Sequence, residues 1–523
     1  MLQIKNMTIT HKKDLRPLVR DLSFTLNPGD KAAMIGEEGN GKSTILKRIY
    51  DKTLTEDYTE STGEIIKNHE VLGYLAQELT AEEKSGSVYE FLAKEPLFFD
   101  MDQKELALLA GRLRLPLELL YSDRRLGTLS GGEKIKLQLV RMLCRRPTIL
   151  LLDEPSNDID METLEWLEEF IRSSKEAVLY ISHDEVLLEH TANMILHLEQ
   201  VKRKTEPRYT VVRTSYSEYI SSREHGLQRQ EQLAKKEHSE YEKQQERFRK
   251  IQQKVEHQQN AITRQDPHGG QLLKKKMHAV KALEHRMEKE YADRTKTPDT
   301  EEAIFFKLSV EDRLPAGKRV LDFRLEELTV PKEGDSESTR FLARGIELHV
   351  TGPEKICIIG KNGAGKTTLL RQIAKELLAR TDVKASYMPQ NYEELLELDK
   401  NPVEYLSITG DKEELTRIRT YLGRMKYTPE EMSHPIAELS GGQKSKILLL
   451  KMSMSGSNVL ILDEPTRNFS PLSNPVIREH LRNFGGAIIS ISHDRKYIRE
   501  VCDRVYELGE AGLNSYIFPD GTK

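Results

Sequence analysis

The chain has 523 residues, a formal net charge of −4 and 31% charged against 37% hydrophobic residues. This composition is typical of a soluble protein of two or three domains, and no apolar run approaches the roughly 20 residues of a membrane helix. The cysteines Cys144, Cys357 and Cys502 lack the spacing of a metal or disulfide site, and the N-terminus lacks a signal-peptide pattern. We therefore expect a cytoplasmic, reducing environment.

Short β-type runs mark a first domain, expected over residues 1–205. Because they alternate with helix-length segments, they predict an α/β domain with a mostly parallel sheet. These runs are Lys31–Ile35, Thr148–Leu152, Ala177–Ile181 and Met194–Leu198.

The first run leads into a phosphate loop. Residues 36–43 read Gly-Glu-Glu-Gly-Asn-Gly-Lys-Ser and fit the pattern G-x-x-x-x-G-K-[ST]. Glycines let the backbone N–H groups point at phosphates, and the following helix N-terminus adds positive potential. We expect Lys42 to reach the β- and γ-phosphates and the Ser43 hydroxyl to bind Mg²⁺. The nucleotide-binding residues predicted here are Gly36, Gly39, Gly41, Lys42, Ser43 and Thr44.

Four further motifs follow in the same domain. Gln77 is placed to reach Mg²⁺ or the attacking water. A Leu-Ser-Gly-Gly segment before a helix offers a second anion site from Ser130, Gly131 and Gly132. Asp153 ends an apolar strand, where it can hold Mg²⁺ through water, and the adjacent Glu154 can polarise the attacking water. His183 ends the next strand and is expected to contact the γ-phosphate.

Residues 206–316 are predicted to be a linker that contains a helical hairpin over about 222–297. Ser221 and Glu224 fit a capping box at the start of a first helix of about 35 residues, which would be about 50 Å long. This helix is too long and polar to be buried, so we expect it to project. The tip is expected at about 257–270. Apolar residues that recur every seven positions predict the seam between two antiparallel helices: Leu227, Ala234, Tyr241, Phe248 and Val255, then Leu273, Val280 and Met287, with Met277 and Tyr291 beside them.

The hairpin concentrates the basic charge of the chain. Residues 223–296 carry 18 lysines and arginines against 12 aspartates and glutamates, so the rest of the chain carries about −10. The predicted tip has no aromatic residue, which favours phosphate contacts over stacking on bases. The candidate RNA contacts are Arg264, Lys274, Lys275 and Lys276. The alternative is a solvated spacer between two domains.

The last segment, 317–523, repeats the motifs of the first domain after strand-like runs at Lys355–Ile359, Asn458–Leu462, Ala487–Ile491 and Arg504–Leu508. In both copies 24 residues separate the signature serine from the glutamate, and 29 separate that glutamate from the histidine. A spacing this regular indicates one folding unit used twice. The equivalent site residues are Gly360, Gly363, Gly365, Lys366, Thr367, Thr368, Gln390, Ser440, Gly441, Gly442, Asp463, Glu464 and His493, of which Thr367, Gln390 and Asp463 are candidate Mg²⁺ ligands.

Each copy contains two phosphate-binding segments, although one nucleotide needs only one phosphate loop. The simplest arrangement is that each Leu-Ser-Gly-Gly segment closes over the nucleotide of the other copy. Two ATP molecules would then lie between the halves of a monomer that forms an intramolecular pseudo-dimer.

Together these motifs resemble the ATP-binding cassette superfamily over roughly 400 residues, and two cassettes joined by a hairpin resemble its class F branch. The resemblance implies two tandem P-loop ATPase domains that use ATP and Mg²⁺, with Glu154, Glu464, His183 and His493 as catalytic residues. It implies binding to the tRNA exit site of the 70S ribosome, with the hairpin near the peptidyl-transferase centre, ribosomal RNA and P-site tRNA. Many bacterial members displace antibiotics there, which is the favoured role.

The chain also departs from that family. The usual Thr-Asn-His-Leu-Asp after the Glu-Pro reads Ser-Asn-Asp-Ile-Asp at 156–160, and the second copy has Ser470 where the last aspartate is expected. Because this loop crosses the interface, the two sites are expected to hydrolyse ATP unequally. Phe341 is the candidate for stacking on adenine. The alternatives are a housekeeping class F translation factor, the ATPase subunit of a separate membrane transporter, and a DNA-associated ATPase.

Overall fold

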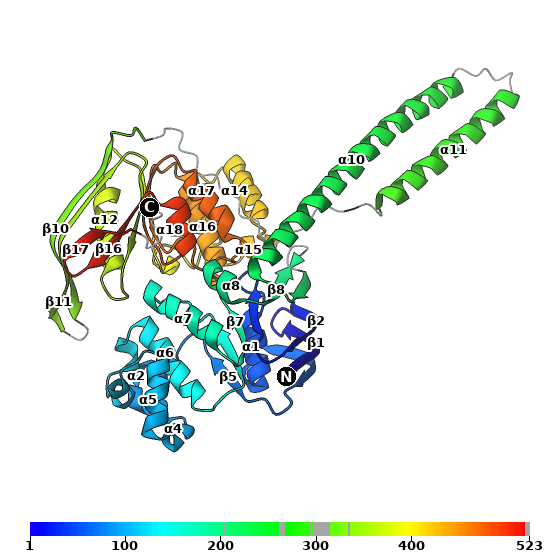
Figure 1. Ribbon diagram of the computed structural model, residues 1–523. Coiled ribbons are helices and arrows are strands. Elements are labelled where there is room, and N and C mark those ends of the chain that lie inside the picture. Colours follow the sequence, from blue (N-terminus) through cyan, green and yellow to red (C-terminus); the bar gives the residue numbers. More distant parts are fainter. Residues whose placement is uncertain (202–204, 261–266, 293–294, 296–313, 333–334, 518–523) are drawn as a thin grey trace. The chain divides into compact units, whose positions relative to one another are not determined.

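The computed structural model describes the chain except residues 202–204, 261–266, 293–294, 296–313, 333–334 and 518–523 (Figure 1). Two compact units are present: Met1–Tyr216 together with Glu301–Lys523, and Ser217–Thr300. The first unit contains both copies of the repeat, called here the first half and the second half, and the second unit is the hairpin. None of the described helices is long and apolar enough to cross a membrane.

The first half is built on a six-stranded sheet in the order β5-β6-β7-β3-β8-β9. All neighbours are parallel except β8 and β9, which confirms the predicted mostly parallel sheet. Because β9 belongs to this sheet, we propose that the first domain extends to about residue 212 and not only to 205. The strands are β5 (Leu72–Leu75), β6 (Ile149–Asp153), β7 (Ala177–Ile181), β3 (Lys31–Ile35), β8 (Met194–Gln200) and β9 (Glu206–Val212).

The central strands of this sheet are buried along their whole length, which is why they read as continuous apolar runs. Every residue of β3, β6 and β7 is buried. Lys31 is charged, but its amine donates to the carbonyls of Ser174 at 2.8 Å and Glu176 at 2.6 Å. Strands covered by other layers on both faces can be apolar throughout.

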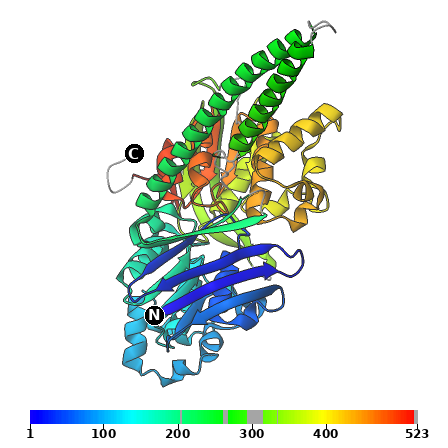
Figure 2. The ribbon, with the colours of Figure 1, turned by 90° about the vertical axis from the view of Figure 1, so that its right-hand side faces the viewer.

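A second, antiparallel sheet completes the first half. Its order is β2 (Pro17–Leu26), β1 (Leu2–His11) and β4 (Thr59–Ile66), and β1 and β2 face the viewer in dark blue in Figure 2. The helices that carry or flank site residues are α1 (Lys42–Tyr50), α6 (Gly131–Leu143), α7 (Met161–Ser173) and α8 (Glu185–Thr191). The segment between the phosphate loop and the signature holds the short helices α2 (Ala81–Ser85), α3 (Val88–Ala93), α4 (Leu97–Asp100) and α5 (Gln103–Arg112).

The second half repeats this topology in a sheet of order β13-β14-β15-β12-β16-β17. Its strands are β13 (Ala385–Met388), β14 (Val459–Asp463), β15 (Ala487–Ile491), β12 (Lys355–Ile359), β16 (Arg504–Gly509) and β17 (Gly512–Ser515), with a hairpin of β10 (Arg319–Lys332) and β11 (Asp335–Thr351). Its helices are α12 (Lys366–Ala379), α13 (Pro402–Leu406), α14 (Lys412–Arg424), α15 (Pro429–Ser433), α16 (Gly441–Met454), α17 (Asn474–Arg482) and α18 (Arg495–Val501). The predicted runs therefore coincide with the observed strands to within two residues.

The two halves meet through ion pairs in which the second half supplies the cations. Arg478 of α17 donates to both carboxylate oxygens of Glu185 of α8, at 2.5 and 3.2 Å, and these side chains are only 4% and 5% exposed. Lys496 lies 3.1 Å from the same carboxylate. Arg495 reaches Glu168 at 3.0 Å and also Asp184. The complementary charges fix how the halves face each other.

The hairpin unit consists of α10 (Tyr216–Asn260, 45 residues) and α11 (Pro267–Ala292, 26 residues). The predicted 35-residue first helix beginning at Ser221 is wrong, because the observed helix starts five residues earlier. The same Ser-x-x-Glu spacing occurs at Ser215 and Glu218, directly at the observed start. At 1.5 Å per residue α10 is about 68 Å long.

The predicted seam holds the two helices side by side (Figures 1 and 2). Tyr241 of α10 stacks on Tyr291 of α11 with ring centroids 3.6 Å apart. Phe248 and Val280 are buried against each other, with Met277 and Met287 packed around them. The side chains of Val255 and Leu273, and residues 261–266 of the predicted tip, lie outside the described residues.

Candidate nucleotide sites

Each phosphate loop lies between a buried strand and a helix and curls through glycines with positive φ. The values are 142°, 82° and 84° at Gly36, Gly39 and Gly41, and 144°, 79° and 96° at Gly360, Gly363 and Gly365. A Cβ at Gly36 would lie 2.2 Å from the carbonyl oxygen of Leu198, and one at Gly360 would lie 2.7 Å from that of Leu508. Only glycine fits these two positions.

The two loop lysines take up equivalent positions. The Lys42 amine donates to the carbonyls of Gly36 at 2.8 Å and Glu37 at 2.9 Å. The Lys366 amine donates to those of Gly360 at 2.7 Å and Lys361 at 3.0 Å. Each ammonium is thus held over its own loop, where phosphates would approach. Thr44 and Thr368 lie in the first turns of α1 and α12.

The candidate Mg²⁺ ligands come together at the ends of the strands. The Ser43 hydroxyl donates to Asp153 at 2.8 Å, and the Tyr74 hydroxyl donates to its other oxygen at 3.1 Å. Burial raises the pKa of Asp153 and of Asp463, and the Thr367 hydroxyl opposes the rise at Asp463. One oxygen of Asp463 is buried and has no hydrogen-bond partner among the residues that the structure describes.

These groups fit a magnesium ion. Hydroxyl and carboxylate oxygens are its preferred ligands, and it is commonly bound through one or two carboxylates plus substrate phosphates. The described residues contain no group of three or more His, Cys, Asp or Glu that could hold a metal by themselves. The donor set therefore suits an ion that arrives with a nucleotide.

The glutamate of the first half is surrounded by donors. Glu154 accepts hydrogen bonds from Gln77 at 3.0 Å and Asn157 at 2.5 Å, and its other oxygen lies 3.4 Å from Nε2 of His183. His183 in turn contacts the Phe469 carbonyl of the other half at 2.6 Å. Burial raises the pKa of Glu154, but its contacts with His183, Lys42 and Asn157 together outweigh burial and lower this pKa to about 2.

The glutamate of the second half has weaker partners. Glu464 accepts from the Ser492 hydroxyl at 3.4 Å and the His493 N–H at 3.3 Å, and Nε2 of His493 lies 3.8 Å away. Burial and the neighbouring Asp463 raise the pKa of Glu464 to about 8. Burial and Lys366 lower the pKa of His493 to about 4, and its Nδ1 is buried without a partner.

Both glutamates share one backbone feature. Glu154 has φ 51° and Glu464 has φ 53°, in the left-handed region that non-glycine residues seldom occupy. Asp158 and Asn468, four residues later in each half, also have positive φ. Residues held this way cluster at functional sites.

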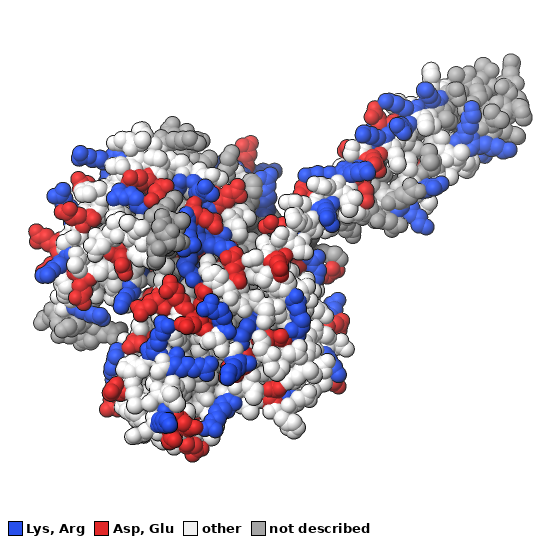
Figure 3. Space-filling view, viewed as in Figure 1, with Lys and Arg blue, Asp and Glu red and all other residues white. Residues whose placement is uncertain are grey.

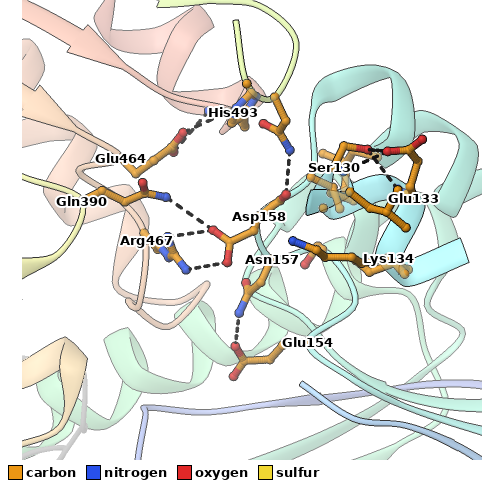
Figure 4. Close-up of a pocket in the computed structure, with 18 of the residues that line it drawn as sticks. Ser130, Glu133, Lys134, Glu154, Asn157, Asp158, Gln390, Glu464, Arg467 and His493 are labelled. Atoms are coloured by element: carbon orange, nitrogen blue, oxygen red, sulfur yellow. Dashed lines mark hydrogen bonds and ion pairs between the residues drawn. The ribbon is translucent and has the colours of Figure 1, made fainter. Parts of the chain in front are cut away.

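The phosphate loop of the second half faces the signature loop of the first, and we call this pair the second composite site. A cavity of about 1000 Å³ lies here and extends to Gln77, Glu154 and His183 of the first half (Figure 4). Asn362 donates to the carbonyl of Asp158 at 2.7 Å, and Gln390 contacts the Asp158 carboxylate at 3.4 Å. Residues of the first half that line the cavity include Ser130, Gly131, Glu133 and Lys134, and those of the second half include Lys366, Thr367, Thr368, Gln390, Asp463, Glu464 and His493.

The first composite site pairs the phosphate loop of the first half with Ser440, Gly441 and Gly442. Here two loop acids make the contacts. The N–H of Gly442 donates to the Glu38 carboxylate. Glu37 accepts from the Ser473 hydroxyl at 2.5 Å and lies 3.4 Å from the Lys446 amine. Sequence reasoning missed Glu37 and Glu38, although two acids inside a phosphate loop are an unusual signal.

The two loops that follow the catalytic glutamates also differ. Asp160 caps α7 by accepting from the N–H of Thr163 at 3.0 Å, whereas α17 has no side-chain cap and begins only at Asn474. Arg467 of one loop forms a two-pronged ion pair with Asp158 of the other, at 2.9 and 3.0 Å. Arg467 and Asp158 are both positions where the loops depart from the usual Thr-Asn-His-Leu-Asp, so two of these departures contact each other.

The stacking of Phe341 on adenine stays a prediction. Phe341 does not line the cavity, and its neighbours Arg340 and Leu342 do. Successive side chains of a strand point to opposite faces, so the residues on either side of Phe341 in β11 face the site together.

The ABC transporter family model matches residues 19–157 and 343–467, which include both phosphate loops and both signature loops. ABC transporter F family member 5 of Arabidopsis thaliana is 25% identical, over 95% of this chain and 74% of that protein. ATP-binding cassette sub-family F member 3 of Pongo abelii is 28% identical, over 95% and 70%.

Solved structures of the same fold cover the whole chain. A chain in the crystal structure of the complex of archaeal ribosomal stalk protein aP1 and archaeal ribosome recycling factor aABCE1 matches with a TM-score of 0.57 and 16% identity, over 99% of this chain and 94% of that chain. The RNase-L inhibitor matches with a TM-score of 0.55 and 16% identity, over 98% and 91%. At this identity the likeness shows the fold alone.

Proposed function

We propose a role on the ribosome for this chain, which belongs to the ATP-binding cassette family and, with the relatives named above, to its class F branch. It binds nucleotide and is an ATPase. The observation that carries the proposal is the combination of two facing nucleotide sites with a long basic hairpin in one chain.

We propose the following chemistry for the nucleotide sites. Ser43 and Asp153 would hold Mg²⁺ in one site and Thr367 and Asp463 in the other, with Gln77 and Gln390 nearby, and the ion would neutralise charge on the phosphates. Lys42 and Lys366 bind the β- and γ-phosphates. Glu154 and Glu464 are placed to polarise water, and His183 and His493 to orient the γ-phosphate, wherever a site holds ATP.

ATP binding favours the closed arrangement of the two halves. A nucleotide on one phosphate loop also contacts the signature loop of the other half, so it binds the closed form more tightly than the open form. Hydrolysis and loss of phosphate remove that contact. This cycle lets the protein bind its partner in one nucleotide state and leave it in the other.

The hairpin supplies the RNA-binding surface. Lysines and arginines lie along both helices (Figure 3), and Lys274, Lys275 and Lys276 are all exposed. Arg264, the fourth candidate contact, lies outside the described residues. Ammonium groups bind phosphates without reading sequence, as contact with folded RNA requires.

The partner is the ribosome, which also places the protein in the cytoplasm. Two solved structures of this fold are described as a ribosome recycling factor with a ribosomal stalk protein and as ribosome-bound Pelota and ABCE1. We place the chain, as a monomer, in the tRNA exit site of the 70S particle, with its hairpin near the P-site tRNA and the peptidyl-transferase centre. The role we favour is protection from antibiotics that bind there.

Sedimentation tests the ribosome proposal. The Glu154→Gln, Glu464→Gln double variant should bind ATP, hydrolyse it poorly and co-sediment with 70S particles. If it stays at the top of the gradient with ATP present, the proposal is wrong. Drug susceptibility of cells with and without the gene then separates antibiotic protection from a housekeeping role in translation.

A charge variant tests the hairpin. Replacing Lys274, Lys275 and Lys276 by alanine should weaken co-sedimentation and make it less salt-dependent, because each phosphate contact adds to the salt slope. The matched control replaces Lys235, Lys236 and Lys243 of α10, which are also exposed. Equal losses in both variants would show that only general charge matters.

A further inference from the structure

The phosphate loop of the first half carries an acid where the second loop carries an amide. The third residue of each loop is Glu38 in the first and Asn362 in the second, and the second residue is Glu37 in the first and Lys361 in the second. A phosphate loop binds a polyanion, so two carboxylates inside it oppose its usual ligand. Their contacts show what they do.

The Glu38 carboxylate rests on the signature loop of the other half. It accepts a hydrogen bond from the N–H of Gly442, in the first turn of α16. A Cβ added to Gly441 would lie 3.3 Å from both carboxylate oxygens. The amides of a helix N-terminus are an anion site, and in this structure that site is filled by a side chain of the protein.

In the second composite site the equivalent residue of the phosphate loop is neutral. Asn362 donates its amide to the carbonyl of Asp158, and it lies 3.4 Å from the Cβ position of Gly131. The side chain that the facing phosphate loop presents to this signature is therefore neutral, and the carboxylate that contacts Ser130 is Glu133 of the same signature, at 2.8 and 2.9 Å. A γ-phosphate here would meet no carboxylate from the facing phosphate loop.

Glu37 adds to the difference. It is buried and contacts the Ser473 hydroxyl and the Lys446 ammonium, so it neutralises a cation of α16 that lies at this loop. The equivalent Lys361 is 79% exposed and lies 3.8 Å from Glu162. Carboxylates of the first loop thus make the bridges to the other half that a phosphate would otherwise make.

The catalytic glutamate of the first half is also engaged. Three side chains, Gln77, Asn157 and His183, contact its carboxylate, so water has to compete with them. Among the described residues, Glu464 has a hydroxyl at 3.4 Å and a backbone N–H at 3.3 Å as its only hydrogen-bond donors. The first composite site, where Glu38 contacts the signature loop, is therefore also the site whose catalytic glutamate is less free to polarise water.

We propose that Glu38 takes the place of the γ-phosphate at the signature loop of the first composite site, so that this site holds a nucleoside diphosphate and the second composite site alone turns over ATP. The inference rests on the ATPase assignment and not on the ribosome. A carboxylate and a γ-phosphate about 4 Å apart repel enough to weaken triphosphate binding about fivefold to 1000-fold, depending on how well water screens them.

Equilibrium binding to the full chain with Mg²⁺ tests the proposal, with the non-hydrolysable analogue AMP-PNP and with ADP as probes. The wild type should bind one AMP-PNP tightly and, at a second site, bind ADP at least fivefold more tightly than AMP-PNP. Glu38→Asn, which copies the second loop, and Glu38→Gln, which keeps the shape, should each create a second tight AMP-PNP site. ADP affinity should change less than twofold.

The converse variant assigns the sites. Asn362→Glu should weaken the tight AMP-PNP site at least fivefold. Unchanged affinity of the first AMP-PNP in the Glu38 variants shows that they are folded. Two equivalent AMP-PNP sites in the wild type, or Glu38 variants that still bind only one, would overturn the proposal. The assay contains no ribosomes, so its result is independent of sedimentation.

Discussion

The two composite sites share every motif and the spacing from signature to histidine, yet their side chains make different contacts. In the second, the signature loop faces the amide of Asn362 and an open cavity. In the first, it faces the carboxylate of Glu38. Motif positions guarantee the fold of a site, whereas the variable positions between them determine which ligand it accepts.

The loops that cross the interface differ in a related way. Asp160 carries a carboxylate toward the second composite site, where it lies near enough to act on His493. The corresponding residue of the other loop is Ser470, and the carboxylate of the first composite site comes instead from the phosphate loop. Both of these acids, Asp160 and Glu38, are thus supplied by the first half, from two different loops.

The largest expected effect is a difference in ATPase activity between variants of the two catalytic glutamates. Glu464→Gln should lower steady-state ATPase activity by about 10² to 10⁴-fold, the usual contribution of a general base, and Glu154→Gln by less than tenfold. Phosphate release measures both. Equal losses would show that both sites turn over ATP. The two composite sites would then not differ in activity.

The next effect tests the interface outside both sites. Arg478→Met leaves Glu185 without its main partner in a buried position and should lower the free energy of unfolding by about 3–5 kcal/mol. Urea unfolding followed by the fluorescence of Trp166, the single tryptophan, measures it. Arg504→Met, at a half-exposed pair 3.7 Å from Glu354, is the control and should cost under about 1 kcal/mol. A similar loss in both would mean that the buried pair does not hold the halves together.

A pH effect should belong to the first composite site. Burial raises the pKa of Glu37, but Lys446 and Ser473 lower it by more and hold it below its ordinary value of 4.5. Its stabilisation is therefore complete above about pH 4.5 and is lost as the pH falls further. The difference in melting temperature between wild type and Glu37→Gln should be constant from pH 7 to 5 and shrink below 4.5. A constant difference down to pH 3.5 would contradict the assignment.

The smallest effect concerns Arg467 and Asp158, whose side chains are 27% and 57% exposed. A double-mutant cycle with Arg467→Ala and Asp158→Ala should give a coupling free energy of about 0.2–1 kcal/mol, because water screens an exposed ion pair. Coupling above about 2 kcal/mol would show that these loops, and not the buried pair, dominate the contact between the halves.

Local patterns explain which predictions succeeded. The strands were found because they are buried throughout and therefore apolar throughout, and the hairpin seam because its apolar residues recur every seven positions. The start of α10 was placed wrongly because two Ser-x-x-Glu patterns lie six residues apart and either fits a capping box. Phe341 was chosen for its chemistry alone, and strand alternation turned its neighbours toward the cavity.

The sequence by itself determined the two repeated folding units, their phosphate loops, and the strand ends that carry Asp153, Glu154, Asp463 and Glu464. These features depend on neighbours within a few residues, so spacing and composition encode them. Only the tertiary structure decided that Glu38 meets Gly442, that Arg467 meets Asp158 and that Glu185 meets Arg478. Such contacts join segments about 300 or more residues apart, and they depend on how two folded surfaces pack, which no local pattern records.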